Sequence, residues 1–524
     1  MRIWRGWHSR PVVIGVAVAT FVVCCVLPLA HLLLTTLVAT GEYGIALDSR
    51  QRGLLYNTAI LGGGTATLAT VIGAPLGIVF ARVPLRRKAL VRLITGAPVL
   101  LPPYVVALAW VNFGSSRGPL GQIVGADVAS EWTYSLPAAI LILSLVLYPL
   151  SMLSTEVALR RVDGRLEEAA MTVAAPGRVM WRITLPLVAP AILAAALIVF
   201  VLAVSEFGVP GLLRVRVYTT EVFTAFAALY DFSRAIALAV PLLVLCVAVS
   251  AASAWLLRDR LVTARRSVGV SPVLLGSWRR PAAVAVLLVI AAAVVLPLLT
   301  LIARALDARS LATATGGSLE AIVNSLLLAA AGATIVVALA VWLGYEQARA
   351  SRGLRIAAQV TLVVLFAVPS TIIGVGLIGL WNRSGPPGAL YGTDAMFVLA
   401  YLARFVPVAT LIMAAAIQTV SVSQEEAAAV SGIGWFRTMR GVVLPQVKVG
   451  VAAAWVVAFV LAFGELGASI LVAPPGEATL PIRIYTIIAN TPPSHVAVLA
   501  LLQSLVIFIP VAAFGAYVSL REDR

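Results

Sequence analysis

Apolar residues in this chain gather into long runs that are separated by short polar segments rich in arginine. We place twelve such runs, each holding the roughly 20 residues that a helix needs to cross a ~30 Å hydrocarbon core. They lie near residues 11–38, 54–81, 90–113, 133–157, 185–209, 235–257, 281–303, 320–345, 356–381, 395–418, 445–472 and 496–519. Backbone groups in lipid must be hydrogen-bonded within their own segment, so each run is predicted to be a transmembrane helix.

The composition supports this interpretation. The 524 residues are 61% hydrophobic and 11% charged, with a mean hydropathy of +1.02. These values exclude an ordinary soluble globular protein. A membrane β-barrel would show alternating strands of ~10 residues, which the pattern lacks. The predicted fold is an all-α integral membrane protein with about twelve transmembrane helices.

One polar segment occurs twice. The first copy runs from Glu167 to Pro186 and the second from Glu425 to Pro445. Each copy opens with glutamates and alanines, closes on Leu-Pro, and is followed at once by a long apolar run. A membrane protein that shows the same polar loop twice is expected to have two equivalent docking surfaces.

The correspondence extends along the whole chain. Paired positions keep an offset of 267 in the early helices of each half, and of 258 or 259 in the later ones. The pairs are Asn57 and Asn324, Pro102 and Pro369, Pro149 and Pro407, Pro186 and Pro445, and Glu206 and Glu465. We therefore predict two parallel repeats of six helices, residues 1–257 and 281–524, joined by a cytoplasmic linker at 258–280. The net change in offset falls in an external loop, where insertions are best tolerated.

Basic residues set the predicted orientation. With the N-terminus in the cytoplasm, 27 of the 38 lysines and arginines fall in cytoplasmic segments, as the positive-inside rule requires. Both termini are then cytoplasmic, and so are both copies of the polar loop. The net charge of +16 is thereby explained as a topology signal, and no nucleic-acid partner is predicted.

Neither the cysteines nor the histidines indicate a metal or redox site. Cys24, Cys25 and Cys246 all fall in apolar runs, and the three histidines are isolated from one another. The first apolar run is too long for the core of a signal peptide and lacks a convincing small-residue cleavage site, so we expect an uncleaved first helix.

The repeated loop resembles the EAA loop of binding-protein-dependent ABC importer permeases. The whole chain resembles the fused-dimer subfamily that includes ferric-iron and thiamine permeases. This resemblance implies a short helix that lies along the membrane and seats in a cleft of a separate ATP-hydrolysing subunit. In such systems a separate binding protein captures the substrate outside and docks on the external loops.

The second copy matches the family pattern, with Gly432 six residues after Glu426. The first copy has no glycine at the corresponding place, and its Gly177 comes three residues late. Matching Leu-Pro places Glu167 in the role of the coupling glutamate, whereas matching Glu-Ala-Ala places Glu168 there. The resemblance assigns ATPase coupling to the following residues: Glu167, Glu168, Ala169, Ala170, Gly177, Glu425, Glu426, Ala427, Ala428 and Gly432. The alternative is a loop helix that merely caps a helix pair.

The chain itself lacks the means to bind ATP in the P-loop manner. Its two lysines, Lys88 and Lys448, neither follow glycine nor precede serine or threonine. We therefore expect no cofactor in this chain. ATP would be used by a partner ATPase, present in two copies.

Glu206 and Glu465 lie at matching places near the external end of the fifth helix of each half. A charge in a spanning segment costs about 2.5–3.5 kcal/mol at the membrane centre, so it usually faces the interior of the bundle. These glutamates are candidates for the translocation pathway; the alternative is that they reach water or bond to a neighbouring helix. Arg404 has the apolar Val146 as its counterpart, so we expect it to form a local pair.

The predicted protein is the multi-pass permease subunit of an ABC importer in a bacterial cytoplasmic (inner) membrane. Its predicted substrate is ferric iron, with thiamine, a polyamine, a phosphonate or another small solute as alternatives within the class. A proton-coupled secondary transporter is the competing class. It should place ionisable residues deep in several helices and gives no reason for a duplicated Glu-Ala-Ala loop.

Overall fold

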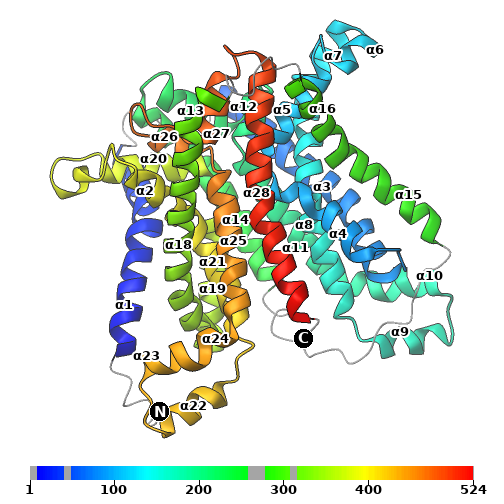
Figure 1. The fold of residues 1–524 in the computed structure, drawn as a ribbon, viewed down its shortest axis with the longest axis vertical. Coiled ribbons are helices and arrows are strands. Elements are labelled where there is room, and N and C mark those ends of the chain that lie inside the picture. The colour runs from blue at the N-terminus through cyan, green and yellow to red at the C-terminus, as the bar shows by residue number, and fades with distance from the viewer. Residues whose placement is uncertain (1–8, 40–48, 258–277, 307–314, 523–524) are drawn as a thin grey trace.

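The computed structural model describes residues 9–39, 49–257, 278–306 and 315–522. All regular structure in these residues is helical (Figure 1). Nine helices are long and apolar enough to cross a membrane, and three further pairs of bent helices raise the number to twelve within the described part. The predicted all-α membrane fold is confirmed.

The first half contains fourteen α-helices. They are α1 (Ser9–Phe21), α2 (Leu27–Ala39), α3 (Ser49–Arg82), α4 (Lys88–Gly96), α5 (Pro103–Gly114), α6 (Pro119–Val124), α7 (Ala126–Thr133), α8 (Leu136–Arg160), α9 (Gly164–Met171), α10 (Pro176–Val179), α11 (Leu185–Ser205), α12 (Gly208–Leu212), α13 (Tyr218–Ala227) and α14 (Phe232–Leu257). Single π-helical turns at Val22–Val26 and Met180–Thr184 join α1 to α2 and α10 to α11.

The second half repeats most of this order within its described residues, with a 3-10 turn at Pro386–Ala389 where the first half has α6 and α7. Its helices are α15 (Arg279–Ile290), α16 (Leu296–Leu306), α18 (Leu319–Arg349), α19 (Arg352–Ala367), α20 (Ser370–Trp381), α21 (Ala395–Ile417), α22 (Val422–Val430), α23 (Trp435–Thr438), α24 (Leu444–Gln446), α25 (Lys448–Phe463), α26 (Ser469–Val472), α27 (Leu480–Ile487) and α28 (Pro493–Glu522). The π-helical turns recur at matching places, Ala291–Val295 and Met439–Val443.

Each half is built on one closely packed helix pair, α3 with α8 and α18 with α21. Glycines at matching positions allow the close approach. A Cβ on Gly77 would lie 2.5 Å from the carbonyl oxygen of Met152, and one on Gly344 would lie 2.8 Å from Cβ of Met413. Small residues at helix contacts are the usual means of packing in membranes, where burial of apolar surface supplies little drive.

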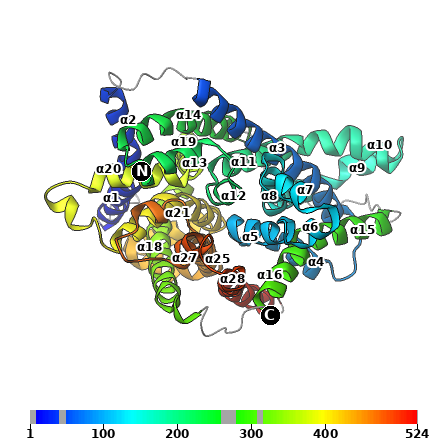
Figure 2. The same ribbon diagram turned by 90° about the horizontal axis from the view of Figure 1, so that it is seen from above.

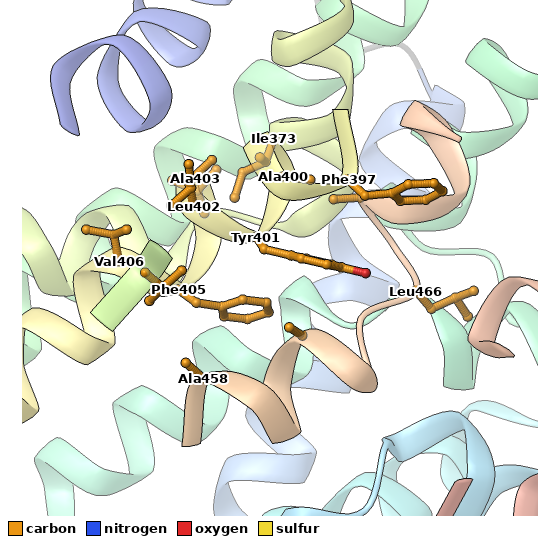
Figure 3. Packing of buried hydrophobic residues seen from close by; sticks show 14 of the residues in the cluster. Ile373, Phe397, Ala400, Tyr401, Leu402, Ala403, Phe405, Val406, Ala458 and Leu466 are labelled. Atoms are coloured by element: carbon orange, nitrogen blue, oxygen red, sulfur yellow. The ribbon is translucent and has the colours of Figure 1, made fainter. Parts of the chain in front are cut away.

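α21 also packs against α25, which in turn packs on α18. Tyr401 and Phe405 project from α21, and Figure 3 shows their rings pointing toward the segment that carries Ala458 and Leu466. The two ring centroids are 6.3 Å apart. This packing brings α21 beside the end of α25, where Glu465 follows.

Two of the predicted spans are broken. The helices on either side of Leu101–Pro102 meet at 93°, and those on either side of Val368–Pro369 meet at the same angle. Both Leu101 and Val368 are extended, because a proline disfavours the helical conformation of the residue before it. The prediction of one continuous helix over residues 90–113, and of another over 356–381, is therefore wrong.

A third break separates α24 from α25, at Val447, with a bend of 77°. The span predicted over 445–472 is also shorter than expected, because α25 ends at Phe463. In the first half the predicted run 185–209 likewise ends at Ser205. The glutamates that follow these two helices explain their ends, as described below.

The first helices of each half pack against the other half. α1 and α2 contact α18, α20 and α21, whereas α15 and α16 contact α3, α4 and α5. In the view from above, α3, α8 and α11 lie on one side and α18, α21 and α25 on the other (Figure 2). The crossed helices tie the two sides together.

Both repeated loops lie at the same end of the molecule. Figure 1 places α9 and α10 with α22 and α23 at the bottom, near the start of α1 and the end of α28. Short helices α12, α13, α26 and α27 lie at the opposite end, called here the outer end. Most of the predicted linker 258–280 lies outside the described residues, so the boundary between the halves stays a prediction.

Candidate functional site: coupling helices and central cavity

The first repeated loop is held by a buried ion pair. Glu167 in α9 has no exposed surface and accepts hydrogen bonds from Arg82 Nη2 at 2.9 Å and Thr184 Oγ1 at 2.6 Å. Arg82 is the last residue of α3, and its guanidinium also donates to the carbonyl of Leu159. Charge-assisted bonds of this kind connect α9 to the end of α3 and to the start of α11.

The second loop has the same anchor. Arg349, the last residue of α18, donates to Glu425 Oε1 through Nη2 at 2.5 Å and Nε at 3.0 Å. Tyr345 donates its phenol to the other carboxylate oxygen at 2.8 Å. Arg82 and Arg349 are 267 apart and Glu167 and Glu425 are 258 apart, so the pair is part of the duplication.

This geometry decides how the two loops align. Glu167 corresponds to Glu425, and both are buried. Glu168 corresponds to Glu426, and both are exposed. The alanines follow the same order, with Ala169 and Ala427 exposed, Ala170 half-buried and Ala428 buried. Glu168 and Glu426 therefore present their side chains to solvent at the bottom of the molecule. Glu167, which matching Leu-Pro places in the role of the coupling glutamate, is buried. The choice between Glu167 and Glu168 as the coupling residue stays a prediction.

The glycine of the second loop has a conformational role. Gly432 has a φ of +74°, and the following Ile433 N–H donates to the carbonyl of Ala428. Only glycine adopts this left-handed conformation at low cost after a helix. The first loop is one residue shorter and reaches α10 with negative φ throughout. Gly177 lies inside α10 and does not form this turn, so it is no structural counterpart of Gly432.

Glu206 and Glu465 follow the ends of their helices and do not lie within them. The N–H of Gly208 donates to Glu206 Oε1, and the N–H of Ala468 donates to Glu465 Oε1, both at 2.9 Å. A side chain that accepts from the backbone just ahead of it competes with helix continuation. The prediction that Glu206 and Glu465 lie inside spanning helices is therefore wrong, because each follows the end of its helix. Both glutamates lie toward the end of the molecule that carries α12 and α26, opposite the repeated loops (Figure 1). That this end is external stays a prediction.

The two glutamates line one cavity between the halves. Its volume is about 320 Å³, and it lies against both proline breaks, at Pro102 and next to Ser370. Most of the lining is apolar, from α8, α11, α21 and α25. The charged lining residues are Glu206, Glu465 and Arg404.

Arg404 pairs with one of these glutamates. Its Nε lies 2.9 Å from Glu465 Oε2, and Nη1 donates to the carbonyl of Val368 beside the proline break. The expected local pair is confirmed. Val146, the counterpart of Arg404, also lines the cavity but carries no charge, so the lining holds two carboxylates and one guanidinium.

Hydrogen bonds join the halves around the cavity. Tyr104 donates its phenol to Gln503 Oε1 at 2.5 Å, and Gln503 donates to the carbonyl of Phe463. Ser205 donates to the carbonyl of Ala367 at 3.1 Å. The bonds Tyr104–Gln503 and Ser205–Ala367 cross between the halves, and the bond to Phe463 holds Gln503 against the end of α25. Movement between the halves would therefore act directly on groups beside the cavity.

A group of one aliphatic and three aromatic side chains lies at the side of the cavity toward the outer end, where Phe207 and Leu466 line it. The four side chains are Phe207 and Leu466, at matching positions after the two glutamates, and Phe223 and Tyr485, at matching positions of α13 and α27. The ring of Phe207 lies 4.6 Å from that of Phe223 and 5.5 Å from that of Tyr485, measured between centroids. Burial raises the pKa of the Tyr485 phenol. We call this group the outer seal.

Beyond the outer seal lies a second, basic pocket. Phe207 and Tyr485 form its floor, and its volume is about 640 Å³. Arg50, Arg214 and Arg216 line it together with Glu221, which accepts from Arg50 Nη2 at 2.5 Å. Phe207 lines both this pocket and the central cavity, so its ring separates a basic outer space from an inner space with two carboxylates.

Among the residues that the structure describes, no group of three or more His, Cys, Asp or Glu side chains could hold a metal ion. The three cysteines are free and buried. The expectation of no cofactor stays a prediction.

Sequence reasoning missed two parts of this site. Arg82 and Arg349 are among the basic residues used above to predict the orientation, and no other role was predicted for them. Their offset of 267 nevertheless matches the duplication. Phe207 and Leu466 directly follow the two candidate glutamates, but their approach to Phe223 and Tyr485 depends on the folding of α12 and α26. The sequence alone could have shown that Arg82 and Arg349 occupy matching positions of the two halves. It could not have shown that the outer seal forms.

The fold and site define a multi-pass transport permease made of two repeats with a cavity between them. The chain matches the model of the binding-protein-dependent transport system inner membrane component family twice, over residues 73–262 and 336–522. It belongs to this family.

Two relatives match most of this chain. The Fe(3+)-transport system permease protein FbpB 2 of Haemophilus influenzae is 24% identical over 509 residues, which cover 94% of this chain and 95% of the relative. The putative ferric transport system permease protein FbpB 1 of the same organism is 23% identical over 464 residues, covering 83% and 71%. The molybdenum transport system permease protein ModB of Escherichia coli is 32% identical over 148 residues, covering 27% of this chain and 65% of ModB.

The buried anchor gives a stability prediction. Arg82→Met removes the arginine from the buried carboxylate of Glu167, which should cost about 3–5 kcal/mol. We expect a lower thermal unfolding midpoint in detergent and faster proteolysis between α9 and α10. The double variant Arg82→Met with Glu167→Leu should recover most of the loss, and Glu168→Gln, at the exposed neighbour, should have no effect. A single variant as stable as the wild type would contradict the anchor.

Proposed function

We propose that the chain is the membrane subunit of an ABC importer that moves ferric iron into the cell. A binding protein outside the membrane delivers the substrate, and a separate ATPase, in two copies, supplies the energy. The observation that carries this proposal is the pair of anchored loop helices at one end of the molecule, with a two-carboxylate cavity between the halves. The importer class also rests on the family, and iron rests on the relatives that match nearly the whole chain.

The exposed residues Glu168 and Glu426 are the proposed contacts with the ATPase. Ala169 and Ala427 beside them leave little side chain between the helix and a partner surface, and a glutamate can pair with a partner arginine. The buried glutamates one residue earlier hold each helix to its own half. A force that the ATPase exerts on the exposed face of α9 or α22 would therefore move α3 or α18 as well as the loop helix.

The end that carries these helices is proposed to face the cytoplasm, with both termini, as the basic residues indicate. Substrate would then enter through the basic pocket at the outer end and pass the outer seal into the central cavity. Glu206 and Glu465 are the proposed pathway residues. In the present conformation the outer seal is closed.

One observation favours a second candidate substrate. The basic outer pocket and the partial relatives named for molybdenum transport both suit an oxyanion. Two carboxylates against one arginine in the central cavity suit a cation better. Iron is therefore preferred, and molybdate joins thiamine among the alternatives to be tested.

The substrate is tested by uptake into vesicles that contain this chain, its ATPase and its binding protein. Labelled ferric iron should accumulate with ATP, and only when all three components are present. Molybdate and thiamine are run in parallel. Accumulation of another solute without iron would leave the importer class standing and overturn the iron proposal. Failure of any ATPase to associate would overturn the coupling proposal.

Reversing the charge at one loop tests the docking. Glu426→Arg places a like charge against the arginine expected on the ATPase, which costs several kcal/mol. Uptake should fall by more than tenfold, while yield and thermal midpoint stay unchanged because Glu426 is exposed. Glu168→Arg tests the first loop in the same way, and Glu131→Arg in α7, exposed at the outer end, is the matched control. Normal uptake in both loop variants would refute docking through these residues.

The outer seal can be tested without substrate. Ser370→Cys places a thiol in the central cavity, and a membrane-impermeant thiol reagent is added from the outer side. With the seal intact, labelling should be slow; adding Phe207→Ala should raise it at least tenfold, because the ring between the two spaces is removed. Leu229→Ala, at an exposed site after α13, should leave labelling unchanged. Equal labelling with and without Phe207 would show that the ring does not close the cavity.

A further inference from the structure

An apolar groove runs along the membrane-facing side of the first half, between α3 and α11. Its volume is about 650 Å³. Except for Thr67 and Thr70, the side chains that line it are apolar, and several are small, among them Ala74, Ala189 and Ala196. The groove begins next to α10, where Trp181 and Leu185 line it.

The second half fills the corresponding place with its own side chains. Pro75 and Ala196 of the groove correspond to Trp342 and Trp455, at the offsets of 267 and 259 that relate the two halves. Trp455 reaches from α25 to α18, where its Nε1 donates to Thr334 Oγ1 at 3.1 Å.

Trp342 completes the filling of this surface in the second half. Its ring centroid is 5.6 Å from that of Trp435 and 6.4 Å from that of Phe436. Two tryptophans thus occupy in one half the surface that small residues leave open in the other. An unfilled groove lacks the contacts that dispersion would supply, so an outside group of matching shape is stabilised there.

The end of the groove near α10 carries positive charge. Trp181 is 72% exposed, as is usual for tryptophan at a membrane interface. Arg178, one helical turn before it, and Arg182, next to it, are both exposed. Neither guanidinium forms an ion pair with any residue in the described part of the chain.

We propose that the groove between α3 and α11 binds one anionic phospholipid, with an acyl chain along Pro75 and Ala196 and the phosphate on Arg178 and Arg182. Basic residues next to clefts between membrane helices are suited to anionic head groups. The assignment to the cytoplasmic leaflet rests on the orientation proposed above, whereas the site itself does not.

The position of the site links it to the first coupling helix. Leu185 lines the groove, and the preceding Thr184 donates to the buried carboxylate of Glu167. A lipid in the groove therefore packs directly beside the anchor of α9. In the second half Trp342 and Trp455 occupy the corresponding surface, so no lipid is proposed at that place.

Native mass spectrometry of the full chain tests the site. The purified protein is equilibrated with phosphatidylglycerol or with phosphatidylcholine, and the lipid retained under increasing collisional activation is counted. We expect the wild type to retain one phosphatidylglycerol more strongly than any phosphatidylcholine. Ala196→Trp and Pro75→Trp, which copy the second half, should each lose this tightly held lipid. Leu505→Trp in α28, at another exposed site, should retain it.

The head-group contacts are tested separately. Arg178→Gln and Arg182→Gln should each reduce the preference for phosphatidylglycerol by about fivefold, without removing a lipid of either kind. Arg437→Gln, the counterpart of Arg178 in the second half, is the control.

Two results would overturn the proposal. Wild-type retention of phosphatidylglycerol in both tryptophan variants would exclude the groove. Equal retention of the two lipids by the wild type would indicate annular lipid only. Neither outcome depends on ATP or on the transported substrate, so failure of the lipid site and failure of the importer proposal can be told apart.

Discussion

The buried pairs Arg82–Glu167 and Arg349–Glu425 are the interactions on which the rest of this structure depends. They are the ion pairs by which the repeated helices α9 and α22 are joined to the long helices α3 and α18. Each pair fastens its loop helix to the end of α3 or α18, which in turn packs tightly on α8 or α21 through Gly77 or Gly344. A buried ion pair is weak evidence for net stability, but removing one partner from it is strongly destabilising. Here it makes the loop and the long helix one body.

The two halves share a framework and differ in what fills it. The proline breaks, the glutamates at the helix ends and the arginine anchors occur twice. The side chains at other matching positions differ. Arg404 has Val146 as its counterpart in the cavity lining, and Trp342 and Trp455 occupy the positions where Pro75 and Ala196 leave a groove. A fused pair of repeats can diverge in this way, since each position then serves one half only. As a result, the cavity is lined by one arginine and two carboxylates. The membrane-facing surface has a groove in the first half at the place that tryptophans fill in the second.

Much of this could be predicted from sequence, and the limits have physical causes. The apolar runs and the offsets of 267 and 259 predict the helices and the duplication, because length and periodicity depend on local chemistry alone. The bends at Pro102 and Pro369 were also readable in principle, yet a proline inside an apolar run does not say whether the helix kinks or turns through 93°.

Other features depend on packing between distant segments. Neither the crossing of α1 and α15 to the opposite half nor the burial of Glu167 beside an exposed Glu168 has a local signal. The same holds for the outer seal, where Phe207 meets Tyr485 from the other half. The sequence placed the candidate glutamates correctly in register, but it could not show that both end a helix and line one cavity.

We propose that the anchored loop helices, by moving α3 and α18, carry movement to the outer seal. This proposal is tested most directly by the distance between spin labels at Thr224→Cys and Thr486→Cys, exposed and matching positions of α13 and α27, in a chain without its three native cysteines. With the ATPase trapped in its ATP-bound state, the account predicts a longer label distance. It also predicts that this change is lost when both anchors are replaced by Met–Leu pairs. A distance that changes equally with and without the anchors would contradict the account.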